Sequence, residues 1–193
     1  CDPIRARGLD LTAATLGAFT KYPCAQGLQK NGAAARYKKF GLATEDVASF
    51  ETDAELCGLP KLGEGGWARH PLAFLMEAAD DVSYLIADIE DAYVSRIIRY
   101  DDVVEQLGAL CGFSSSQFES IERERARSGN TAAVRYVRAS AVGACIRALR
   151  TTMQEVYSAM MSGEQLQSLM NASPMAEAYR AVQKWSVRHI YNH

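Results

Sequence analysis

EAADDVSYLIADIEDA, residues 77–92, is the most informative segment of the sequence. It holds six carboxylates and no Lys or Arg, and it combines strong helix formers with an absence of Gly and Pro, so it predicts a helix. At about 100° per residue, one side of this helix is apolar and the other carries most of the acids around one phenol. The acidic stripe comprises Glu77, Asp80, Asp81, Tyr84, Asp88 and Asp91, and the apolar side comprises Leu75, Ala78, Val82, Leu85, Ile86 and Ile89.

The stripe needs a counter-charge, because like charges one turn apart repel by about a few tenths of a kcal/mol per pair. A divalent metal ion, a neighbouring Arg, or solvent and salt would each meet this need, and a solvated surface is the ordinary interpretation. Two details favour a functional face: Glu90 is the only acid off the stripe, and Tyr84 lies in its middle. Asp80, with Asp81, Tyr84 and Asp88 nearby, is a candidate metal ligand. One helix cannot complete such a site.

The composition is that of an ordinary globular chain. With 193 residues, 48% apolar content and a net charge of −2, it suits one domain or a large part of one and has no global attraction to nucleic acid or membranes. No apolar run approaches the roughly 18 residues of a membrane span. The five cysteines form no CxxC pair, so we expect reduced thiols in a cytoplasmic protein. The absence of an initiator Met, with the start at Cys1-Asp2-Pro3, leads us to expect a fragment.

Periodicity predicts helices throughout and no strand, so the predicted fold class is all-α. A long loop is expected over 24–43, where periodicity is absent, and Pro71 should open the acidic helix, since Pro is favoured in a first helical turn. The predicted helices cover 11–20, 44–58, 71–98, 101–110, 114–127 and 131–161, followed by a short helix after Gly163 and a last one over 175–190.

Other groups could also carry chemistry. Lys21, in the segment Lys21-Tyr22-Pro23 after the first helix, either interacts with that helix's C-terminus or presents an ammonium to phosphate. His70 could cap the acidic helix or line a cleft. Residues 121–150 hold seven Arg and two Glu, which ordinary or ion-paired surface explains better than nucleic-acid binding does. Some of these Arg residues are candidates to neutralise the acidic stripe. The phosphate loop GxxxxGK[ST] and the patterns GxGxxG, GxSxG and HExxH are absent.

The segment RHPLAFLMEAADDVSYLIADIEDA, residues 69–92, closely resembles the core helix of the dGTPase family, deoxynucleoside triphosphate triphosphohydrolases of the HD-domain superfamily. LDLTAATLGAFTKYP (9–23) and KWSVRHIYNH (184–193) resemble other regions of that family. The resemblance implies part of an HD-domain-like helical bundle. Residues 1–112, with a metal-ligand helix over 71–98, would be the C-terminal part of the HD core, and 113–193 a helical extension packed on it.

The resemblance also implies site roles. The family splits a dNTP into deoxynucleoside and triphosphate with a divalent metal such as Mg²⁺ or Mn²⁺. Asp80 would be one metal ligand, Tyr84 and Asp88 would face the sugar, and Lys21, next to Tyr22, would contact phosphate. We expect a dNTP substrate, a homo-oligomer when full length, and binding of single-stranded nucleic acid as a further option. Alternatives are another HD phosphohydrolase, such as a nucleotidase, and a non-catalytic helical module for assembly or nucleic-acid binding.

The sequence departs from the family at the remaining metal ligands. It contains no His-Asp dipeptide, and His70, His189 and His193 do not stand in the family's metal-binding context. The 193-residue chain alone is therefore expected to release no triphosphate from any dNTP in a metal-supplemented assay. Robust turnover that is abolished by Asp80→Ala would show that the ligands have been misplaced.

Overall fold

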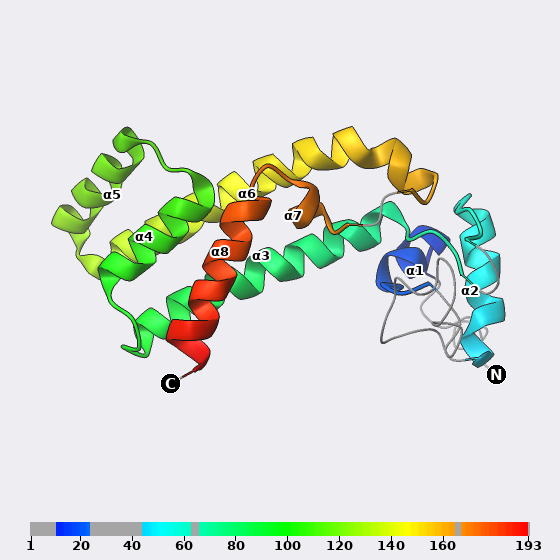
Figure 1. The fold of residues 1–193 in the computed structure, drawn as a ribbon, viewed down its shortest axis with the longest axis horizontal. Helices are drawn as coiled ribbons and strands as arrows, with labels where there is room; N and C mark the ends of the chain where they lie inside the picture. Colours follow the sequence, from blue (N-terminus) through cyan, green and yellow to red (C-terminus); the bar gives the residue numbers. More distant parts are fainter. Residues whose placement is uncertain (1–10, 24–43, 63–65, 165–166, 193) are drawn as a thin grey trace, which may run out of the picture. The chain divides into compact units, whose positions relative to one another are not determined.

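The structure is a computed structural model that describes residues 11–23, 44–62, 66–164 and 167–192. These residues are helical and contain no strand, only an isolated antiparallel bridge between Lys61 and Trp67, which confirms the all-α prediction (Figure 1). None of the helices in the described ranges is both long and apolar enough to cross a membrane. The predicted loop over 24–43 lies outside the described residues. The elements are α1 (Ala13–Phe19), α2 (Thr44–Leu56), α3 (Pro71–Val94), α4 (Tyr100–Cys111), α5 (Ser115–Ser128), α6 (Asn130–Met161), α7 (Leu169–Ala172), α8 (Ala176–Ser186) and the π-helical turn η3 (Val187–Tyr191).

Helix α3 begins at Pro71, as predicted, but it ends at Val94 and not at 98. The reason is a left-handed residue, Arg96, with a φ of 61°. The amide of Ile97 donates to the carbonyl of Ala92 at 2.9 Å, which closes the helix in the way that a C-terminal glycine usually does. Because Arg and not Gly occupies that position, the end of the helix could not be predicted here.

The apolar side of α3 is buried as its periodicity predicts. Ala78, Val82, Leu85, Ile86 and Ile89 are all buried, and Leu75 is half-buried. The side chains of Ile86 and Ile89 are almost wholly removed from water, which stabilises the fold by roughly 1.5–3 kcal/mol for each residue. This burial determines which side of α3 stays available for other contacts.

The chain divides into two compact units. The first comprises Cys1–Glu77 and Glu155–Gln167, and the second Ala78–Gln154 and Ser168–His193. In the first, α1 packs on α2, and Phe50, Ala54, Leu59 and Trp67 form a small core. The Phe50 and Trp67 rings meet edge to face at 5.5 Å. The organisation expected from the resemblance, an HD core over 1–112 and an extension over 113–193, stays a prediction.

In the second unit, α8 packs against α4 and α7. Buried side chains from α4, α5, α6 and α8, including Leu107, Ile121, Val137 and Val182, contribute to its interior. Cys145 is buried and Cys111 half-buried, and the cysteines among the described residues are free thiols. This unit holds Asp80, Tyr84 and Asp88 together with the C-terminal elements.

A substitution at Gly163 tests how tightly the first unit is packed around this residue. Its φ is +76°, and an added Cβ would lie 2.8 Å from Leu62 Cδ2 and 3.2 Å from Ala68 Cβ. Gly163→Ala should therefore lower the free energy of unfolding by about 2–3 kcal/mol, through backbone strain plus overlap. The matched control is Gly58→Ala in the same unit, where φ is +66° and no atom lies within 4 Å, and about 1 kcal/mol is expected. Equal losses in urea unfolding would contradict this assignment.

Candidate functional site

The N-terminal end of the acidic stripe is neutralised by two cations. The Glu77 carboxylate lies 3.2 Å from Lys21 Nζ through Oε1 and 2.9 Å from Arg69 Nη2 through Oε2. Arg69 is 9% exposed, and its guanidinium stacks on the Phe74 ring at 4.2 Å. A neighbouring Arg was one of the counter-charges considered from the sequence, and it is present for this acid.

The ion pair with Glu77 raises the pKa of Lys21. Burial alone lowers the pKa of Lys21, but the Glu77 carboxylate outweighs burial, so the pKa lies above its ordinary value. The segment is also anchored through its backbone, because the Trp67 amide donates to the Pro23 carbonyl at 2.9 Å. The ring of Tyr22, half-buried, lies 5.7 Å from Lys21 Nζ. The ammonium is thus held and protonated, which is compatible with the predicted phosphate contact and does not test it.

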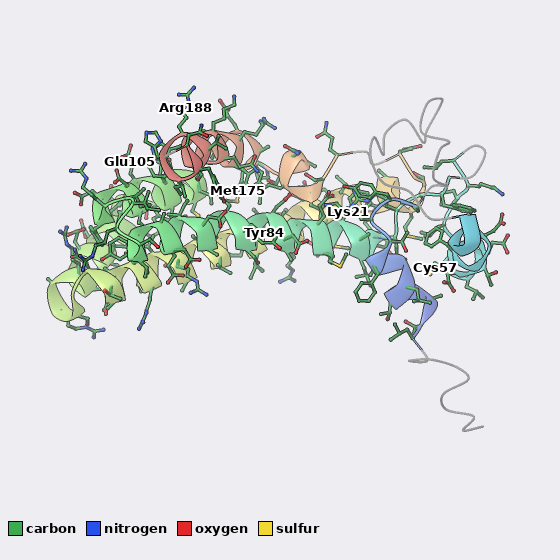
Figure 2. All side chains as sticks on the ribbon, turned by 90° about the horizontal axis from the view of Figure 1, so that it is seen from below. Lys21, Cys57, Tyr84, Glu105, Met175 and Arg188 are labelled. Carbon is green, nitrogen blue, oxygen red and sulfur yellow. The ribbon has the colours of Figure 1, made fainter. Side chains whose placement is uncertain are left out.

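Farther along α3, Tyr84 and Asp88 line a groove of about 900 Å³ together with residues of α8 and η3. Tyr84 is 69% exposed and Asp88 is half-buried. The hydroxyl of Tyr191, in η3, donates a hydrogen bond to Asp88 Oδ2. This hydrogen bond, with some burial, raises the pKa of Tyr191. Figure 2 labels Tyr84 on α3 and Arg188 on η3, the two elements between which the groove lies.

The groove could hold a nucleoside. A phenol, a carboxylate with one oxygen already fixed by Tyr191, and apolar ring surface are groups that can bind a sugar and its hydroxyls. The two residues predicted to face a sugar, Tyr84 and Asp88, are thus brought to one groove. Lys21 belongs to the other unit.

The described residues do not make a metal site by themselves. Asp80 is exposed, and no group of three or more His, Cys, Asp or Glu side chains is gathered among the residues that the structure covers. A divalent ion needs several such ligands. No chemical step is therefore assigned to a metal.

The histidines that the structure describes have local partners. Nδ1 of His70 accepts from the amide of Leu72 at 3.1 Å, so His70 caps the start of α3, one of the two roles considered for it. Burial lowers the pKa of His70, which favours the neutral acceptor form. His189 stacks on Trp185 at 4.7 Å, and its Nδ1 lies 2.9 Å from the Trp185 carbonyl. His193 lies outside the described residues.

The partners of two acids of α3 could not be identified from the sequence. Tyr191 is 103 positions from Asp88, a separation over which a single sequence carries no pairing signal. Arg138 pairs with Glu90 at 2.8 Å. An Arg of the 121–150 region does neutralise an acid of α3, but that acid is the one off the stripe.

The described residues form an all-α bundle. Comparison with known proteins shows which proteins the chain is similar to. No protein-family model matches the sequence. A deoxyguanosinetriphosphate triphosphohydrolase-like protein of Synechocystis sp. is 28% identical over 199 residues, covering 99% of this chain and 43% of that protein. A protein of the same description from Pseudomonas aeruginosa is 39% identical over 107 residues, 54% of this chain and 24% of that protein. A deoxyguanosinetriphosphate triphosphohydrolase of Yersinia enterocolitica is 30% identical over 145 residues, 69% of this chain and 29% of that protein.

The chain belongs to the dGTPase family, as the resemblance in the sequence indicated. It spans less than half the length of each of these curated relatives.

A substitution at Glu77 tests whether its ion pairs with Lys21 and Arg69 stabilise the fold. Glu77→Gln leaves the buried Arg69 guanidinium without its carboxylate, so the free energy of unfolding should fall by about 2–4 kcal/mol. The matched control is Glu51→Gln in the same unit, which breaks an exposed pair with Lys61 and should cost less than about 1 kcal/mol. Chemical denaturation measures both values. A cost for Glu77→Gln no larger than that of the control would contradict the assignment.

Proposed function

We propose that the protein to which these residues belong hydrolyses a dGTP-like dNTP to deoxynucleoside and triphosphate, and that this chain supplies the nucleoside-binding face. The observation that carries the proposal is the pairing of Tyr84 and Asp88 in one groove, with Tyr191 bonded to Asp88. The printed names of the relatives support the substrate class, since they are described as deoxyguanosinetriphosphate triphosphohydrolases or proteins like them.

In this proposal Asp88 accepts a hydrogen bond from the 3′-hydroxyl of the deoxyribose. Tyr191 occupies Oδ2, and the carboxylate retains further acceptor capacity on Oδ1. A hydrogen bond to a charged acceptor contributes about 1.5–3 kcal/mol when it is well formed. Tyr84, one turn earlier on the same helix, packs against the sugar ring.

The phosphates and the metal complete the proposal. Lys21, held by Glu77, contacts a phosphate oxygen, with Tyr22 beside it. Asp80 is one ligand of a divalent metal such as Mg²⁺ or Mn²⁺, whose remaining ligands come from outside these 193 residues. An HD-type domain, cytoplasmic location, homo-oligomer formation and binding of single-stranded nucleic acid follow from the resemblance and stay predictions.

Sugar recognition can be tested with the chain as it is. Isothermal titration calorimetry in Mg²⁺ should show dGTP binding roughly ten- to a hundredfold more tightly than 2′,3′-dideoxy-GTP, because only dGTP has the 3′-hydroxyl. Asp88→Ala should remove this preference and leave the affinity for dideoxy-GTP unchanged. Asp91→Ala is the matched control, since Asp91 is an exposed acid of α3 outside the groove lining.

Equal affinity for the two nucleotides in the unaltered chain, or the same loss in Asp91→Ala, would contradict the assignment of Asp88 to the sugar.

An assay of the products released by the protein from the full reading frame separates the reaction classes. A dNTP triphosphohydrolase releases tripolyphosphate, whereas another HD phosphohydrolase, such as a nucleotidase, releases orthophosphate. A non-catalytic module releases neither.

A further inference from the structure

Two cysteine side chains meet in the interior of the second unit. Cys111 is the last residue of α4, and Cys145 lies near the middle of α6. The sulfur of Cys111 is 3.8 Å from the carbonyl oxygen of Ala141. Because Ala141 precedes Cys145 by one helical turn, this carbonyl points toward the turn that carries Cys145. The Cys111 thiol also donates a hydrogen bond to the Cys145 sulfur, so the two thiols are direct neighbours.

The surrounding packing holds the two residues in place. Cys145 has no exposed surface, and neither do Ala141 and Val137, which lie one and two turns before it on α6. Helix α4 contributes Leu107, which is buried one turn before Cys111. Cys111 itself is only half-buried, so solvent reaches part of this residue. The pair thus combines a fixed partner in the core with a partner that a small molecule can approach.

This arrangement is one from which a disulfide can form. A disulfide brings two sulfurs to about 2.05 Å and requires Cα atoms no more than about 7 Å apart. Thiols that already form a hydrogen bond between two packed helices need only a small movement to reach that geometry. Cys57 differs from them, because it belongs to the other unit and its charged neighbour is the carboxylate of Asp53.

The protonation of the two thiols determines how they react, because the thiolate is the nucleophile. The hydrogen bond to Cys145, together with burial, raises the pKa of Cys111. The same hydrogen bond lowers the pKa of Cys145, although burial opposes this change. At neutral pH Cys111 is therefore mostly a protonated thiol that reacts slowly, and Cys145 is the better attacking sulfur of the two.

We propose that Cys111 and Cys145 are a site of reversible oxidative modification, at which a peroxide joins α4 to α6 by a disulfide. The Cys111 thiolate attacks one peroxide oxygen, the O–O bond breaks, and a sulfenic acid and one water result. Cys145 then attacks the sulfenic sulfur, so that the S–S bond forms, the S–O bond breaks and a second water leaves with the thiol protons. The thiols lose two electrons and the peroxide gains them. Neither cysteine lines the groove at α3, so the site does not rest on the proposed function.

Peptide mapping of the 193-residue chain tests this site directly. Trypsin releases Cys111 in the peptide 100–123 and Cys145 in the peptide 139–147. The chain is treated with hydrogen peroxide, its remaining thiols are alkylated, and it is digested without reduction. Mass spectrometry should then show the two peptides joined, with the loss of two hydrogen atoms. Dithiothreitol should separate them again.

Cys111→Ala and Cys145→Ala should each abolish the joined peptides. Cys57→Ala is the matched control, since it removes a half-buried thiol of the other unit and should leave their yield unchanged. The unaltered chain decides the outcome even if a variant fails to fold. The site would be overturned if peroxide left Cys145 a free thiol while it carried Cys111 on to the sulfinic acid, or if it joined Cys111 to a different cysteine. Peptides joined only between two chains, seen as a dimer on a non-reducing gel, would also overturn it.

Discussion

The buried side of α3 fixes where its acids lie. Ile86 and Ile89 are almost fully removed from water, and rotating the helix to hide its carboxylates would expose them at a cost of roughly 1.5–3 kcal/mol each. The acidic side must therefore find its partners among cations, hydroxyl donors and water. Each part of the candidate site provides the acids with a different kind of partner.

The partners of the acids differ along α3. Glu77 is bridged by a buried Arg69 and a more exposed Lys21, so that end of the stripe is structurally neutralised. Asp88 instead accepts from the neutral hydroxyl of Tyr191, which fixes one carboxylate oxygen without cancelling the charge. The acid that the protein neutralises thus belongs to the scaffold. Asp88, by contrast, lines the groove, where a ligand can reach its second carboxylate oxygen.

Much of this could be predicted from residues 77–92 and their neighbours, because a helix that is apolar on one side and acidic on the other shows its orientation in its own periodicity. Pro71 marked the start of α3 for the same local reason. The end of the helix was predicted too late, since Arg96 adopts the left-handed conformation that Gly usually signals. The contact between Tyr191 and Asp88 could not be predicted, because the two residues are 103 positions apart and nothing local joins them.

In the proposed function, the acidic side of α3 and the turn η3 bind the nucleoside of a deoxynucleotide. The most direct test is amide chemical-shift mapping of the isotopically labelled chain during titration with dGTP in Mg²⁺. The largest shift changes should fall on the amides of residues 84–88 and 187–191. Changes confined to α4 and α5, with none on α3, would contradict it.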